Sequence, residues 1–130
     1  MERNTLLPSL VQSVMHSPVV TIDRKDTLRS AGAALRDADV GTLVIMDGSV
    51  LAGIVSERDI VWALADGADP DRIQVADVMS GDPRYLTVGQ EMGSAVETML
   101  DVGVRHLPVL EEGEVVGILS IRDLLGTLRA

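Results

Sequence analysis

The sequence predicts an α/β (α+β) fold built from two similar β-α-β-β-α repeats. Two related segments fill most of the 130 residues. Each segment combines short β-branched runs with an apolar stripe of helical period. A chain of this length buries roughly two-thirds of its unfolded surface on folding, but one half alone has little surface to bury. We therefore expect the sheets of the two repeats to pack together as one module.

The repeat is clearest in its second half. Gly53–Asp59 matches Gly117–Asp123, and the glycine, isoleucine, serine, arginine and aspartate of the two segments are identical. The openings of the repeats also agree, because Met15 and Met79 each end a similar short segment. Both matches have the same separation in sequence, which indicates a duplication of a whole unit rather than of one motif.

The repeat boundaries follow from this alignment. The first repeat is predicted over residues 8–66 and the second over 75–128, and the turn-rich residues 67–74 join them. Between the openings and the first helices the predicted alignment slips, by one residue at Pro18 and Pro83 and then by two. This slip pairs Thr21-Ile22 with Thr87-Val88.

The first helix of each repeat is predicted from apolar residues that recur with a period of about 3.6. In the first repeat, Asp26 and Thr27 are suitable N-cap residues directly before this stripe. The two stripes are Leu28, Ala31, Ala34, Leu35 and Ala38, and Met92, Ala95, Val96, Met99 and Leu100.

A β-hairpin and a second helix are predicted to follow in each repeat. Gly48 and Gly113 lie in turn-forming segments between two short apolar, β-branched runs. The predicted strands are 42–46, 51–55, 107–110 and 115–119, and the predicted second helices are Glu57 to Ala65 and Ile121 to Leu128. Both repeats are therefore expected to read strand, helix, strand, strand, helix.

The composition excludes several classes of function. The chain carries 11 basic and 20 acidic side chains, so it lacks the positive surface on which nucleic-acid binding depends. The absence of cysteine excludes disulfides, thiolate metal sites and cysteine nucleophiles. The longest uninterrupted apolar run, Ile60–Ala65, is far shorter than a bilayer-spanning helix. We expect a soluble, cytoplasmic protein that binds neither nucleic acid nor membrane.

The repeated Gly-Ile-x-Ser-x-Arg-Asp segment has two interpretations. In the first, Ser56 with Asp59 and Ser120 with Asp123 only cap the following helix, because Ser-x-x-acid is the spacing of a capping box. In the second, the free amides at the helix start bind a phosphate, the serine and arginine add donors, and the carboxylate accepts both hydroxyls of a ribose. Two copies, each with an arginine beside the aspartate, favour the nucleotide site.

Other polar residues do not assemble into a catalytic or metal site. Arg105 and His106 have no counterparts in the first repeat, where Gly41 and Thr42 stand instead. His16 has no acidic or histidine neighbour at metal-ligand spacing, so no role is assigned to it. Because no activated nucleophile or metal cage can be identified, we expect no enzyme activity.

These motifs together resemble a pair of cystathionine-β-synthase (CBS) domains, also called a Bateman module. The resemblance covers about residues 8 to 128, and rests on the Val-Met openings, the repeated Gly-Ile-x-Ser-x-Arg-Asp segment and the Arg-His-Leu-Pro-Val stretch. It implies two sheets packed about a pseudo-two-fold axis, with two clefts between the repeats for adenosyl ligands. It also implies dimers that form through the helices.

The resemblance further implies which residues hold the ligand. In the family the aspartate binds the ribose, the strand before the first helix lines the adenine pocket, and basic residues of the facing repeat reach the phosphates. The nucleotide-binding residues carried over are Thr21, Ile22, Ser56, Arg58, Asp59, Thr87, Val88, Arg105, His106, Ser120, Arg122 and Asp123. The Asp59 cleft is expected to bind more tightly, because Arg105, His106 and Arg122 would face it.

Three functions of different classes remain. The preferred one is a regulatory module that binds AMP, ADP, ATP or a related adenosyl compound such as S-adenosylmethionine, needs no cofactor, and acts in trans on an unknown protein. The alternative is a dimerisation or interaction module without a bound ligand, and an enzyme is the least favoured. Trp62 and Leu125, on the second helices, are expected to bury against a second copy in a homodimer.

Overall fold

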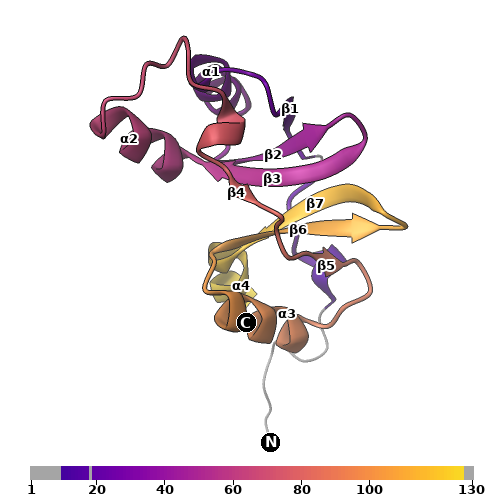
Figure 1. Cartoon of the computed structure of the whole chain (residues 1–130). Coiled ribbons are helices and arrows are strands. Elements are labelled where there is room, and N and C mark those ends of the chain that lie inside the picture. Colours follow the sequence, from indigo (N-terminus) through magenta and orange to yellow (C-terminus); the bar gives the residue numbers. More distant parts are fainter. Residues whose placement is uncertain (1–9, 18, 128–130) are drawn as a thin grey trace, which may run out of the picture. The chain divides into compact units, whose positions relative to one another are not determined.

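Two β-sheets, each with two helices on one side, form the structure, which is a computed structural model (Figure 1). It describes residues 10–17 and 19–127. The chain divides into a central unit, residues 20–83, and a terminal unit, residues 1–19 with 84–130. The predicted α/β class and the predicted order of strands and helices in each repeat are confirmed.

The central unit contains a four-stranded sheet in the order β1-β2-β3-β4. β1 runs parallel to β2, whereas the β2–β3 and β3–β4 pairs are antiparallel. Its elements are β1 (Thr21–Asp23), α1 (Leu28–Ala38), β2 (Thr42–Asp47), β3 (Val50–Ser56), α2 (Glu57–Ala65), the 3₁₀ helix η2 (Val75–Asp77) and β4 (Ser80–Gly81). The predicted bounds of α2 are confirmed, and the hairpin strands are slightly longer than predicted.

The terminal unit contains a three-stranded sheet in the order β5-β6-β7. β5 runs parallel to β6, and β6 is antiparallel to β7. Its elements are the 3₁₀ helix η1 (Val11–Ser13), β5 (Leu86–Thr87), α3 (Met92–Val102), β6 (His106–Glu111), β7 (Glu114–Ser120) and α4 (Ile121–Thr127). α4 begins where predicted, whereas Leu128, its predicted last residue, lies outside the described residues.

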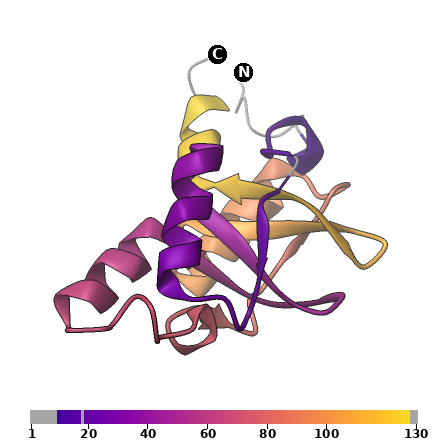
Figure 2. The same ribbon diagram turned by 90° about the horizontal axis from the view of Figure 1, so that it is seen from above.

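The helices cover their sheets with the apolar stripes that the sequence predicts. Figure 2 shows α1 lying over the strands of the central sheet, and it contacts β2. Thr27 is the N-cap of α1, and its side chain accepts a hydrogen bond from Ser30 N at 3.2 Å. The buried residues of the two stripes are Leu28, Ala31 and Leu35, and Met92, Ala95 and Met99. The last members of the two stripes, Ala38 and Leu100, are exposed near the C-terminal ends of their helices.

The opening segment of each repeat packs in the unit that contains the other repeat's hairpin. Val11 of η1 lies in the core of the terminal unit, and Val75 of η2 lies in the core of the central unit. Val11 N donates to Gln90 O at 2.8 Å, and Val75 N donates to Asp26 O at 2.8 Å. The sequence repeats and the spatial units therefore do not coincide.

The strand pairing corrects the predicted alignment of the two repeats. Ile22 and Leu86 occupy equivalent positions, because each pairs with the fourth residue of the parallel strand beside it. The slip that aligned Thr21-Ile22 with Thr87-Val88 is therefore wrong, and Tyr85 is the residue equivalent to Thr21. Matching threonines suggested the slip, but the burial of the apolar residues sets strand register.

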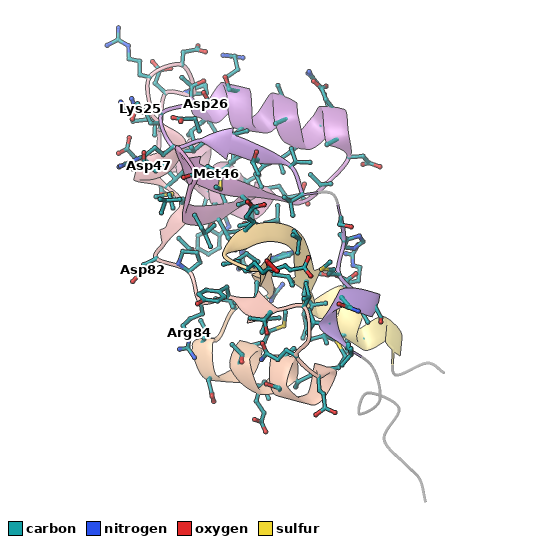
Figure 3. The ribbon with its side chains drawn as sticks, turned by 90° about the vertical axis from the view of Figure 1, so that its right-hand side faces the viewer. Lys25, Asp26, Met46, Asp47, Asp82 and Arg84 are labelled. Carbon is teal, nitrogen blue, oxygen red and sulfur yellow. The ribbon has the colours of Figure 1, made fainter. Side chains whose placement is uncertain are left out.

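One end of the central sheet is strongly charged. Lys25 and Asp26 lie in the turn between β1 and α1, and Asp47 ends β2 (Figure 3). Arg24 Nη1 lies 3.4 Å from Asp47 Oδ2 and so joins this turn to the hairpin. Because this ion pair is solvent-exposed, its contribution to stability is small. The functional candidates of this unit lie at the other end of the sheet.

Candidate functional site

The candidate site of the central unit lies where three strands meet the start of α2. β1 and β2 begin at Thr21 and Thr42, and β3 ends at Ser56, which pairs with Thr42. Because β1 is parallel and β3 antiparallel to β2, these residues stand at the same end of the sheet. The side chains of Thr21, Thr42 and Ser56 lie on one face of the sheet, and Leu43 and Val55 point from the opposite face into the core. Polar groups therefore gather here without disturbing the core.

A complete capping box joins β3 to α2. Ser56 Oγ accepts a hydrogen bond from Asp59 N at 3.2 Å, and Asp59 Oδ2 accepts one from Ser56 N at 2.8 Å. The second carboxylate oxygen, Asp59 Oδ1, has no hydrogen-bond partner among residues 10–17 and 19–127. Capping thus uses one oxygen of the carboxylate and leaves the other available to a ligand.

The hydroxyl group of Thr42 is buried without a partner. Thr42 is 8% exposed, and no described residue makes a hydrogen bond with its Oγ1. An unpaired buried hydroxyl costs about 1–3 kcal/mol, and a polar ligand at this end of the sheet would remove that cost. The sequence prediction did not assign Thr42 to the Asp59 site. The missed signal was a threonine opposite Ser56 at the start of an apolar strand.

The other candidates of the central unit take different positions. Ile22 packs against the core, so its side chain is engaged there and only its backbone remains for a ligand. The Arg58 guanidinium lies 4.8 Å from the centre of the Trp62 ring, one turn further along α2. Its charge is thereby directed along the helix and away from the Ser56 cap.

The same capping box occurs in the terminal unit. Ser120 Oγ accepts from Asp123 N at 3.2 Å, and Asp123 Oδ2 accepts from Ser120 N and from Ser120 Oγ, both at 2.9 Å. His106 pairs with Ser120 across the β6–β7 ladder, and Ile121 N donates to Arg105 O at 2.8 Å. The structure thus brings four of the predicted residues together at the start of α4.

The remaining candidates of the terminal unit are less well placed. Val88 packs against the core, and Thr87 N donates to Gln90 Oε1 at 3.1 Å in the turn after β5. With the corrected register, Tyr85-Leu86 takes the place that the prediction gave to Thr87-Val88. Arg122 is exposed in the first turn of α4.

His16, to which the sequence assigned no role, contacts a candidate residue directly. Its Nε2 lies 2.8 Å from Asp123 Oδ1. The two residues are far apart in sequence, and no local pattern indicates their contact. The pairing of His16 with Ile118, at the edge of β7, brings the imidazole to the start of α4.

Two motif glycines make room for these edge segments. A Cβ on Gly53 would lie 2.6 Å from Met79 Sδ, and a Cβ on Gly117 would lie 2.9 Å from Met15 Cγ. The glycine of each Gly-Ile-x-Ser motif is therefore required by the close approach of the methionine that opens a repeat. This contact also fixes the residue after each methionine beside the motif.

Residues 10–17 and 19–127 contain no group of three or more His, Asp or Glu side chains that could hold a metal ion. Within the same part of the chain, every helix is too short or too polar to cross a bilayer.

Comparisons with known proteins agree with this architecture. A sequence profile of the CBS domain family matches residues 11–66 and 75–130. An uncharacterized 17.7 kDa protein of Acidianus ambivalens is 34% identical over 120 residues, which cover 91% of this chain and 72% of that protein. An uncharacterized protein of Methanopyrus kandleri is 30% identical over 118 residues, which cover 88% of this chain and 60% of that protein.

A solved structure extends the likeness to three dimensions. A CBS domain protein from Pyrobaculum aerophilum, complexed with AMP, matches with a TM-score of 0.81 and 28% sequence identity. The match covers 94% of this chain and 100% of that one. With both repeats matched by the family profile, the chain belongs to the CBS domain family and carries two CBS domains.

Proposed function

We propose that this chain is a regulatory module that binds an adenosyl compound and reports its presence to a protein partner in trans. AMP, ADP, ATP and S-adenosylmethionine are the ligands considered, and none is a required cofactor. The similarity to an AMP-bound CBS domain protein supports this ligand class. Binding would act by favouring one arrangement of the module over another.

The arrangement around Asp59 is the observation that carries the proposal. Its free Oδ1 can accept hydrogen bonds from ribose hydroxyl groups, while Oδ2 remains in the capping box. The unpaired hydroxyl of Thr42 supplies a further polar contact at the same end of the sheet. At the start of α2, a nine-residue helix, the amides of Glu57 and Asp59 already donate to Gly41 O and Ser56 Oγ, so the helix dipole and the Arg58 amide are what favours a phosphate there.

The proposal makes the Asp59 site the tighter of two. By the resemblance to the family, Arg105, His106 and Arg122 would reach the phosphates of a ligand whose ribose is held by Asp59. By the same resemblance, Arg58 would be the one basic residue of the facing repeat at the reciprocal Asp123 site, because Gly41 and Thr42 stand at the positions equivalent to Arg105 and His106. Each charge-assisted contact to a phosphate contributes on the order of 1.5–3 kcal/mol, so the two affinities are expected to differ by about tenfold or more.

Calorimetric titration with AMP, ADP and ATP tests this proposal. Asp59→Ala is expected to remove the tight binding phase, whereas Asp123→Ala is expected to leave it. The opposite pattern would show that the tight site has been assigned to the wrong repeat. Mass spectrometry of small molecules released from the purified protein would identify a retained ligand independently.

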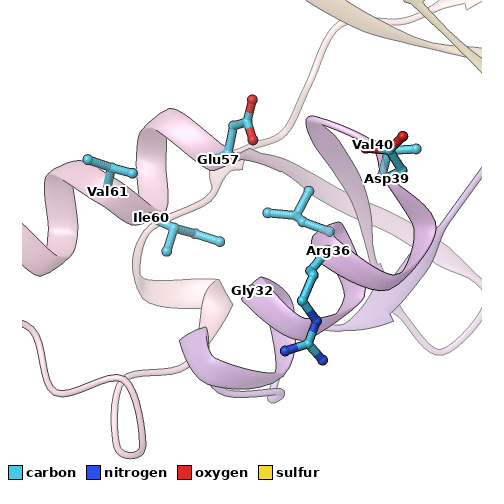
Figure 4. A pocket seen from close by; sticks show the side chains of 8 residues that line it. Gly32, Arg36, Asp39, Val40, Glu57, Ile60 and Val61 are labelled. Atoms are coloured by element: carbon cyan, nitrogen blue, oxygen red, sulfur yellow. The ribbon is translucent and has the colours of Figure 1, made fainter.

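An interaction module without a ligand is the second candidate. The capping boxes alone give both Ser-x-x-Asp pairs a structural role. A groove of about 310 Å³ between α1 and α2 also offers a surface to a protein, with Ile60 and Val61 on one side and Gly32 and Arg36 on the other (Figure 4). Trp62, which is 60% exposed on α2, and Leu125 on α4 are candidates for burial in a homodimer.

Thermal unfolding separates these two functions. A ligand that binds only the folded protein adds about 2.7 kcal/mol to stability at a concentration of 100 times its Kd. If the chain senses a ligand, its Tm should rise clearly with one of the adenosyl compounds. If it is an interaction module without a ligand, the Tm should not change. Turnover of ATP by the purified protein, lost in Asp59→Ala, would instead support an enzyme.

A further inference from the structure

We infer that His16 occupies the Asp123 carboxylate and thereby makes the two repeats unequal in ligand binding. This inference rests on the proposed function, in which Asp59 and Asp123 are the carboxylates that hold a ribose. It identifies a specificity-determining residue that lies outside both Gly-Ile-x-Ser-x-Arg-Asp motifs.

Both oxygens of the Asp123 carboxylate have partners within the chain. Oδ1 lies 2.8 Å from His16 Nε2, and Oδ2 accepts from the backbone N and the Oγ of Ser120. The Asp123 side chain is 12% exposed, so few other directions of approach remain. A ribose hydroxyl that is to reach Oδ1 must first displace the imidazole.

The Asp59 carboxylate differs mainly at its outer oxygen; in addition, Asp123 Oδ2 accepts a hydrogen bond from Ser120 Oγ that has no counterpart between Ser56 and Asp59. Its Oδ2 accepts from Ser56 N, as Asp123 Oδ2 does from the backbone N of its own capping serine. Its Oδ1 has no partner among the described residues. The two repeats therefore share the same capping geometry, and they differ in whether the outer oxygen is occupied.

The difference arises at a single pair of equivalent positions. His16 pairs with Ile118 and follows the methionine that lies against Gly117, while Ser80 pairs with Ile54 and follows the methionine that lies against Gly53. The imidazole of His16 extends several atoms beyond Cα and reaches the carboxylate of Asp123. Serine is shorter, and Ser80 makes no hydrogen bond with Asp59.

The competition is expected to be moderate in size. The His16 side chain is 71% exposed, so a displaced imidazole returns to water, while the ribose hydroxyl takes its place at the largely buried Asp123 carboxylate. Exposed ion pairs change an equilibrium by up to about fivefold. His16 therefore weakens binding at Asp123 without abolishing it.

An exchange of the equivalent residues tests the inference. AMP is titrated calorimetrically into the wild type, His16→Ser and Ser80→His, with Asp59→Ala and Asp123→Ala used to assign each phase. His16→Ser is expected to raise the affinity of the binding phase assigned to Asp123 about two- to fivefold. The affinity of the phase assigned to Asp59 should not change. Ser80→His is expected to weaken the Asp59 phase. If His16→Ser weakens or leaves unchanged the Asp123 phase, the inference is wrong.

A ligand-free measurement distinguishes failure of the inference from failure of the proposed function. The ring nitrogen resonances of His16 are recorded by NMR in the wild type, Asp123→Asn and Asp59→Asn. Only Asp123→Asn should shift the Nε2 resonance, and the carboxyl carbon of Asp123 should shift in His16→Ser. If neither shift occurs, the contact does not exist and the inference fails, even where AMP binds. If the shifts occur but no adenosyl compound binds, the proposed function fails instead.

Discussion

A Cβ placed on Gly53 would lie 2.6 Å from the carbonyl oxygen of Ser80. Side chains essentially never come so close to a backbone oxygen, so glycine is required where β4 pairs with β3. The glycine that opens the Gly-Ile-x-Ser-x-Arg-Asp motif of the first repeat therefore has a packing role, independent of any ligand. It allows the segment after Met79 to complete the central sheet.

We expect Gly53→Ala to lower the free energy of unfolding. The added methyl group must push β4 away or shift β3, and forced overpacking of this kind costs about 1–3 kcal/mol. Urea denaturation followed by circular dichroism measures the change. Gly81→Ala is the matched control, because a Cβ on Gly81 meets nothing within 4 Å and this residue pairs with Gly53 in the same ladder. Equal effects of the two substitutions would contradict the steric explanation.

Thr42→Val is expected to have opposite effects on stability and on binding. Valine has the shape of threonine without its hydroxyl, so the ligand-free protein should gain about 1 kcal/mol when the unpaired buried group is removed. If Thr42 contacts the ligand, binding should weaken in the same variant. Denaturation and calorimetry on one preparation measure both quantities. A loss of stability in the ligand-free variant would show that Oγ1 has a partner there.

Much of the fold could be predicted because the helical and strand periods are clean. α2 occupies the predicted residues, and Thr27 caps α1 as expected. The burial of the opening segments could not be predicted, since Val11 and Val75 meet their cores through contacts distant in sequence. Nothing in a short apolar segment indicates which of two similar sheets it joins.

The candidate site was only partly predictable for the same reason. The Ser-x-x-Asp pairs have a fixed local spacing, so their capping boxes follow from sequence. His16 and Asp123 are brought together by the pairing of His16 with β7, which no local pattern encodes. The alignment of Thr87 failed because residue identity, rather than burial, was used to set the register.

The ion pair between Arg29 and Asp71 is expected to make stability depend on pH in the acid range. The hydrogen bond from Arg29 is the main cause that lowers the pKa of Asp71 below its ordinary value of 3.8. The unfolded chain therefore binds the proton more readily, so this contribution to stability is present above pH 3.8 and is lost as pH falls through the lowered pKa.

Melting temperatures of the wild type and Asp71→Asn between pH 7 and pH 3 measure this effect. The wild type should be more stable at neutral pH, and the difference should shrink below pH 3.8. Both side chains are largely exposed, so the difference should also decrease with added salt. Asp66→Asn, which neutralises another exposed aspartate of the same unit, is the matched control.

The proposed homodimer predicts a specific effect of Trp62. The wild type is expected to sediment near twice its mass of 13.8 kDa at tens of micromolar. Trp62→Glu should shift it toward the monomer, because a charge would be buried in an apolar contact. Val50→Glu is the control, since Val50 is equally exposed but lies in the β2–β3 hairpin, away from α2. A monomeric wild type would contradict the prediction.

Arg105 is expected to control the preference for phosphate number. By the proposed geometry, its guanidinium contacts the phosphates of a ligand bound at Asp59, and each such contact contributes on the order of 1.5–3 kcal/mol. Arg105→Ala should therefore weaken ATP and ADP binding by about tenfold or more, and should affect adenosine little. The differences in affinity among ATP, ADP and adenosine, measured by calorimetry, should therefore be smaller in the variant.

Arg84→Ala is the matched control for this experiment, because Arg84 is another exposed arginine of the terminal unit and precedes β5 (Figure 3). Both variants remove one positive charge from a chain of net charge −9, so long-range electrostatics change alike. A selective loss in Arg105→Ala would then report a direct contact with phosphate. If both variants weaken ATP binding equally, the effect is that of net charge, and Arg105 does not contact the ligand.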